Sequence, residues 1–239
     1  MNAMKIAFAI PDTVPQTDTD IFASVHKAIR RALADVLCLL GAADFEDAEV
    51  VARIGREVED TLAHCENHLE HEERVVRPVC AGRLIPDAFD TGHPQHLRMI
   101  AELRSLLGAL LASPTGQRSS LGHTLYLHFS VFVADCLQHM AEEERVLLPL
   151  MRHALGAEEL LAIRARIIGS MTPAELTQSA RKILWAANPS EQKALTLGIL
   201  ARAPRPQVLA LLESAKPKLS QTAFANLVSI VNNAPTAAP

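Results

Sequence analysis

Two His-x-x-x-Glu pairs are the residues of this sequence best suited to metal chemistry. His68 lies four residues before Glu72, and His139 lies four residues before Glu143. Residues four apart in an α-helix lie one above the other on the same face. If both segments are helical, each pair directs one imidazole and one carboxylate toward a common point. Such nitrogen and oxygen donors are typical ligands of first-row transition metals.

The two pairs belong to longer segments that repeat at an offset of 71 residues. Residues 68–78 read HLEHEERVVRP, and residues 139–149 read HMAEEERVLLP. One helical turn before each pair, Cys65 aligns with Cys136 in the same repeat. The sequence therefore predicts two helical hairpins that are built alike.

The apolar residues predict the helices that must position these pairs. Side chains from Phe22 to Leu40 recur at helical spacing, and Gly41 stops the pattern. Turn residues then separate further helical segments, and we expect Pro78 to end the second of them. The predicted helices span residues 20–40, 47–77, 94–112 and 120–153. Two similar helical hairpins close naturally into an all-α, up-down-up-down four-helix bundle.

An antiparallel bundle brings further histidines to the level of the two pairs. His26 lies near the start of the first predicted helix, and His96 lies two residues after Pro94 in the third. Helix starts and helix ends alternate at each end of such a bundle, so these histidines lie level with the paired residues. The predicted metal ligands are His26, His68, Glu72, His96, His139 and Glu143.

Four imidazoles and two carboxylates favour a pair of first-row transition metal ions, with the carboxylates free to bridge. Mg²⁺ and Ca²⁺ prefer more oxygen ligands, and a structural Zn²⁺ needs only four ligands. Without a metal, six buried polar groups would need internal partners or would cost several kcal/mol between them. A metal is the simpler interpretation.

Other polar residues near the pairs have different expected roles. His64 and Asp135 occupy equivalent positions in the repeat, so each is a candidate for an additional ligand or a partner of one. We expect His93 to cap the third helix, and Glu73, Glu142 and Glu144 to be solvated or paired with arginines 74 and 145. The remaining histidines are expected not to bind metal: His71, His123, His128 and His153.

The chain after residue 157 has a different pattern, with four or five shorter helices. Thr172 with Glu175, and Asn188 with Glu191, are capping boxes with proline at the first helical position. The sequence thus divides into a leader (1–19), the bundle (20–155) and a helical C-terminal extension (157–233). Because the fourth helix carries its ligands near its end, we expect this extension to cover the metal end.

Composition narrows the function further. The net charge is −4, which gives no basic face for nucleic acid. No apolar run approaches the ~20 residues of a membrane-spanning helix. The four cysteines show no Cys-x-x-Cys spacing, so we interpret them as small buried hydrophobic residues in a reducing compartment. These features predict a soluble, cytoplasmic protein.

Over residues 18–155 the pattern resembles the hemerythrin-like (HHE cation-binding) family. The resemblance rests on one histidine in each of the first and third helices and on His-x-x-x-Glu-Glu-Arg-Val-x-x-Pro in the second and fourth. It implies a centre of two iron ions, oxo- or hydroxo-bridged, that meets O₂, NO or a peroxide. It also implies that the six predicted residues hold the iron.

The sequence departs from the oxygen-carrying hemerythrins. They place a His-x-x-x-His pair on the third helix, whereas here Ile100 follows His96 at that spacing, and the fourth helix offers Glu143. Three functions therefore stay open. The chain binds or senses a small diatomic or a peroxide, or it is an enzyme that reduces NO or peroxide. Alternatively, its metal is structural, and the extension binds a protein partner or a second copy.

Overall fold

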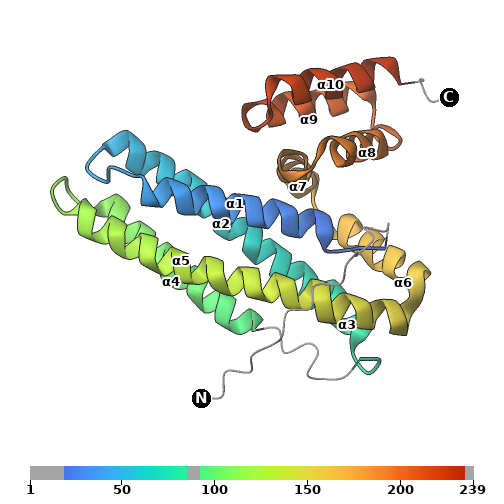
Figure 1. Cartoon of the computed structure of the whole chain (residues 1–239), viewed down its shortest axis with the longest axis horizontal. Helices are drawn as coiled ribbons and strands as arrows, with labels where there is room; N and C mark the ends of the chain where they lie inside the picture. Colours follow the sequence, from blue (N-terminus) through green and yellow to red (C-terminus); the bar gives the residue numbers. More distant parts are fainter. Residues whose placement is uncertain (1–18, 85–91, 235–239) are drawn as a thin grey trace.

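The computed structural model describes residues 19–84 and 92–234, which form helices and no strands. Four of the helices lie side by side (Figure 1), with α1 and α4 each packed against both α2 and α5. Leucine and phenylalanine side chains from all four fill the space between them. These helices are α1 (Ala23–Gly41), α2 (Ala48–His71), α4 (His93–Ala112) and α5 (Arg118–Glu142).

Short connections and local caps set the ends of these helices. The Asp47 side chain accepts hydrogen bonds from the backbone N–H groups of Glu49 and Val50, which begins α2. The α1–α2 and α4–α5 connections lie at one end of the group (Figure 1). The start of α1 and the segments that follow α2 and α5 lie at the other end, where the sequence places the candidate ligands.

Contrary to the sequence prediction, Pro78 does not end its helix at once but lies inside a short helix that ends at Cys80; Pro149 lies inside a helix, as the predicted span 120–153 required. After α2 the chain makes a π turn, Glu72–Val76, and continues as α3 (Arg77–Cys80). After α5 it makes an equivalent π turn, Glu143–Leu147, and continues as α6 (Leu148–Ser170). A proline lacks an N–H and its ring crowds the carbonyl four residues earlier. The wider π turn gives that ring room, so the helix continues.

α6 seals the end of the molecule where the π turns lie. The helical segment that contains His153 ends at Gly156 (φ 75°), close to the predicted end, and a second segment of α6 then runs on to Ser170. Its apolar face packs on the first π turn and on the start of α1. This second core consists of Phe22, Val75, Val76, Cys80, Leu147, Leu148, Met151, Leu155, Leu160 and Ile163. Part of the extension therefore covers this end, as expected.

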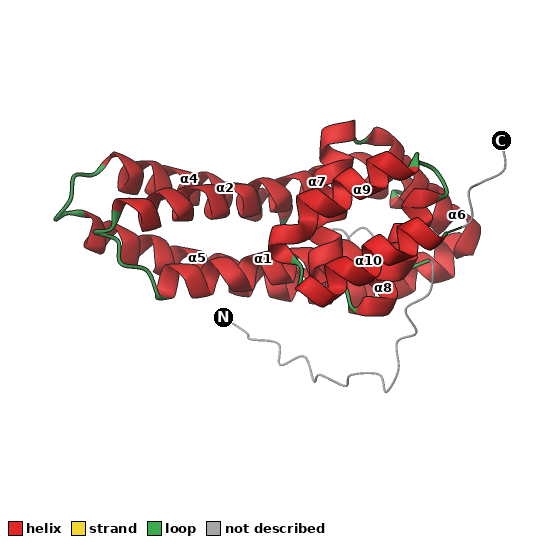
Figure 2. Ribbon diagram, turned by 90° about the horizontal axis from the view of Figure 1, so that it is seen from above, coloured by secondary structure: helices red, strands yellow, loops and turns green. Residues whose placement is uncertain are grey.

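The remaining helices form a unit with its own apolar core. Both predicted capping boxes are present, at the starts of α7 and α8, and Ser220 caps α10. Figure 2 shows the unit lying over α1 and α2 rather than beyond their ends. Lys182 of α7 joins it to α2 through Asp60. The helices are α7 (Pro173–Ala186), α8 (Pro189–Leu200), α9 (Arg205–Ala215) and α10 (Gln221–Asn233).

Three further sequence predictions can be compared with the structure. All but the last residue of the predicted leader, 1–19, lies outside the described residues. No helix within the described ranges has the length and apolar character needed to cross a membrane. Three cysteines are buried as expected, whereas Cys38 is exposed because it lies on the outer face of α1.

Gly122 of α5 provides a test of this packing. A Cβ atom built there would lie 2.2 Å from Cγ of Phe45, so the ring packs directly on the glycine backbone. We expect Gly122→Ala to lower the free energy of unfolding by about 1–3 kcal/mol, as overpacked cores do. Urea denaturation followed by circular dichroism measures the change.

Gly108 of α4 supplies the matched control. A Cβ there meets nothing within 4 Å. Alanine has the better helix propensity, so Gly108→Ala should stabilise the protein by about 0.5–1 kcal/mol. Equal effects of the two substitutions would contradict the close packing of Phe45 on α5.

Candidate metal centre

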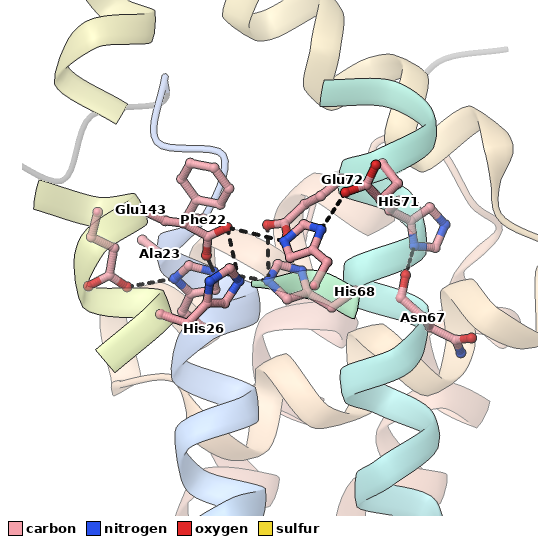
Figure 3. Close-up of polar contacts among 12 residues, drawn as sticks. Phe22, Ala23, His26, Asn67, His68, His71, Glu72 and Glu143 are labelled. Atoms are coloured by element: carbon pink, nitrogen blue, oxygen red, sulfur yellow. Dashed lines mark hydrogen bonds and ion pairs between the residues drawn. The ribbon is translucent and has the colours of Figure 1, made fainter. Parts of the chain in front are cut away.

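Two groups of histidine and glutamate side chains converge where α2 and α5 pass into their π turns. The first group is His26, His68, Glu72 and Glu143, and the second is Glu72, His93, His139 and Glu143. Within each group the candidate ligand atoms all lie within 4.8 Å of one another. Figure 3 shows His26 of α1 and His68 of α2 pointing toward one another at this position. The two groups share both glutamates.

Each shared carboxylate directs one oxygen to each group. Glu72 Oε1 lies 3.1 Å from Nε2 of His68, and its Oε2 lies 3.4 Å from Nε2 of His93. Glu143 Oε2 lies 3.3 Å from Nε2 of His26, and its Oε1 lies 3.2 Å from Nε2 of His139. This is the arrangement that two bridging carboxylates adopt between two cations.

The polar atoms of the site fit a metal better than they fit one another. Both carboxylate oxygens of Glu72, Oε2 of Glu143 and Nε2 of His93 are buried without a hydrogen-bond partner. Nε2 of His26 and Nε2 of His68 lie 3.0 Å apart and can share only one proton. Buried polar atoms normally have partners, and cations at the two groups would provide them.

The second glutamate of each Glu-Glu-Arg motif orients a histidine from the other hairpin. Nδ1–H of His26 donates to Oε1 of Glu144 (2.8 Å), and two Arg30 nitrogens donate to the same carboxylate at 2.6 and 2.9 Å. Nδ1–H of His93 likewise donates to Glu73 (2.7 Å). Such bonds fix the ring and leave Nε2 available to a metal. The expectation that these glutamates are solvated or paired within their own motif is therefore wrong.

Burial and these hydrogen bonds control the charges of the site. Burial raises the pKa values of Glu72 and Glu143 to about 7 and lowers that of His68 well below its usual range. Burial also opposes charge on His26, but the nearby carboxylate of Glu143 and the hydrogen bond to Glu144 outweigh this and raise its pKa to about 9. Neutral His68 is the form that binds metals. The two groups therefore contain buried carboxylates whose negative charge needs a cation nearby.

The structure places His93, rather than His96, in the second group. Gly92, with φ 67°, is the N-cap of α4, so His93 lies inside the first turn and is not the cap that we expected. His96 lies outside both groups, with Nε2 3.0 Å from Oδ2 of Asp135. The two histidines are one helical turn apart on the same face, so spacing alone could not separate them. The near-equal offset of His26 and His96 in the sequence favoured His96 over His93.

The other predicted residues also have defined positions. His64 lies outside both groups, buried one turn before His68, and Nε2 has no hydrogen-bond partner. Burial and the nearby Lys182 lower its pKa to about 3. The histidines that we expected not to bind metal also lie outside the groups: His71, His123, His128 and His153.

Comparison with known proteins supports this interpretation. Residues 17–150 match the Hemerythrin HHE cation binding domain family. This match covers more than half of the chain, which therefore belongs to the hemerythrin HHE cation-binding family. No curated protein and no solved structure was found to match the chain. The family and the clustered His and Glu residues agree that this end of the molecule is a metal-binding site.

Glu144 allows the orienting bonds to be tested. Glu144→Gln removes the charge that holds Nδ1–H of His26, and losses of such partners typically weaken metal affinity by about 10- to 100-fold. Titration of the metal-free protein with Fe²⁺ under anaerobic conditions measures the affinity. Glu142→Gln is the matched control, because Glu142 is exposed, accepts a hydrogen bond from Gln138 and lies outside both groups. Equal affinities in both variants would show that the His26–Glu144 bond does not support the site.

Proposed function

We propose that the chain is a non-haem di-iron protein that binds or senses a small diatomic molecule (O₂ or NO) or a peroxide. In this proposal α1, α2, α4 and α5 form an up-down-up-down four-helix bundle, and the iron ions lie at one end of it. The observation that carries the proposal is the sharing of Glu72 and Glu143, each with one oxygen toward either histidine pair. A single metal ion would not need two such groups.

The proposed ligands follow from the two groups. His26 and His68 would hold one iron, His93 and His139 would hold the other, and Glu72 and Glu143 would contribute to both sites. His93 thus takes the place that the sequence suggested for His96. Four protein donors for each iron leave coordination positions for an exogenous molecule. Bound iron would supply the redox chemistry and the open positions for that molecule.

The surrounding residues keep the site dry and fixed. The ring of Phe22 stacks on His26, with 5.1 Å between the ring centroids. The second core, which includes α6, covers the adjacent π turn. Exclusion of water strengthens the attraction between the carboxylates and cations. The Glu73 and Glu144 carboxylates hold two of the rings in a fixed orientation.

One observation favours an enzyme as the second candidate. Reduction of NO or peroxide consumes protons, so a catalyst needs a proton source beside the metal. Asp135 is 35% exposed and contacts Nε2 of the buried His96. The His96 ring lies 4.8 Å from that of His139, measured between centroids. This chain of side chains runs from solvent to a proposed ligand, and it could deliver protons.

Iron analysis of purified variants tests the di-iron proposal. Because both metals share them, Glu72→Ala and Glu143→Ala should each lose both irons. Inductively coupled plasma mass spectrometry of the reconstituted protein gives the iron content for each chain. Full iron in both variants would place the centre elsewhere in the molecule.

The choice between His93 and His96 is tested in the same way. His93→Ala should lose half of the iron, because it removes a ligand of one metal only. His96→Ala is the matched control, one turn along the same helix face, and should keep all of it. The reverse result would restore His96 as the ligand that the sequence suggested.

Stopped-flow mixing of the reduced protein with O₂, NO or hydrogen peroxide separates binding from catalysis. A long-lived absorbance change without turnover supports a binding or sensing protein. Repeated turnover supports an enzyme, and in that case Asp135→Asn should slow turnover while leaving the iron content unchanged. Absence of any spectral response to all three molecules would contradict both functions.

A further inference from the structure

A small cavity lies inside the core, next to the proposed metal ligands. Its volume of about 20 Å³ accommodates a molecule of roughly the size of water. His68 and His139 form part of the wall, and Cys65, Cys136 and Met140 bring three sulfur atoms to it. The rest of the wall is largely apolar. The cavity therefore places oxidisable sulfur beside the site where the proposed function brings oxidants.

The two cysteines meet there because of the repeat. Each lies three residues before a proposed ligand, Cys65 before His68 and Cys136 before His139, and so on the same helix face. α2 and α5 each pack between α1 and α4, so they lie across the core from one another. Cys65 and Cys136 are 5% and 7% exposed. Contact with the Cys65 thiol, together with burial, raises the pKa of Cys136 above its usual range.

We propose that Cys65 and Cys136 are a two-electron redox pair that hydrogen peroxide oxidises to a disulfide. In this step the two S–H bonds and the O–O bond of the peroxide break. One S–S bond and two new O–H bonds form, so the products are a disulfide and two water molecules. The two thiols lose two electrons, which the peroxide oxygens accept. The thiol hydrogens leave with those oxygens as water.

The surroundings suit this pair to a small oxidant. A cavity of this size excludes larger thiols such as glutathione, so exchange with them is slow. Formation of the S–S bond, about 2.05 Å long, draws the helices together, and the adjacent cavity provides room for that shift. Cys38 is exposed, Cys80 lies in the second core, and neither lines the cavity.

The two thiols would supply two electrons to an oxidant at the iron site, because they lie in the wall of the cavity beside it. This part of the inference rests on the proposed function, since it requires iron beside His68 and His139. His68 and His139 line the same cavity as both thiols, so an oxidant that reacts at the iron would come within reach of the pair. Oxidation of the pair should therefore be faster with iron than without it.

Thiol mapping after peroxide treatment tests the pair. Metal-free and iron-loaded protein are each mixed with equimolar hydrogen peroxide, quenched, denatured, alkylated and digested for mass spectrometry. We expect each chain to lose two hydrogen atoms and to yield a peptide cross-linked between Cys65 and Cys136. Both forms should yield it, and the iron-loaded form should yield it faster, because the thiols line the same cavity as His68 and His139.

Matched variants and the metal-free sample make each outcome decisive. Cys136→Ser should abolish the cross-link, and Cys38→Ser should leave it unchanged. Full alkylation of Cys65 and Cys136 after treatment of both forms overturns the inference. Equal rates with and without iron retain the redox pair and overturn its link to the metal. If the chain binds no iron, the proposed function fails, whereas the metal-free sample still tests the pair.

Discussion

The burial of two carboxylates, Glu72 and Glu143, constrains everything at this end of the molecule. Removing a carboxylate from water is costly, and burial raises the pKa of both to about 7. Their oxygens find imidazoles from four different helices within about 3–4 Å, but few protons to accept. Cations between these groups would offset the cost. The histidines of all four helices must then lie at the same height in the molecule. This requirement fixes how far each hairpin is shifted along the other.

The π turns allow adjacent glutamates to serve different purposes. Glu72 and Glu143 face the histidine groups, and the next residues, Glu73 and Glu144, each bind a histidine from the opposite hairpin. Each hairpin therefore fixes a ring of the other, and metal binding would tie the two hairpins together. π turns occur often at functional sites, and here each follows directly from α2 or α5.

The sequence predicted the positions of the helices and of the two His-x-x-x-Glu pairs, because apolar spacing and i, i+4 geometry are local properties. The capping boxes were predictable for the same reason. The π turns were not, since a proline in a helical pattern normally predicts an end. The choice between His93 and His96 depends on the level of α4 against α2 and α5. The position of α4 along its axis is set by packing between helices and not by local sequence. A shift of one helical turn along that axis moves a side chain by about 5.4 Å.

The C-terminal extension contains two parts with different physical relations to the site. α6 contributes apolar side chains as far as Ile163 to the core that covers the first π turn, so it is continuous with the metal end. α7–α10 bury a separate apolar core, and polar pairs such as Lys182 with Asp60 join them to α2. Lys182 is itself buried, and α7 also packs along α1, where Arg31 lies over the ring of Trp185. The seal over the site is nevertheless separate from this contact, because it is made by apolar side chains of α6 and not by α7–α10.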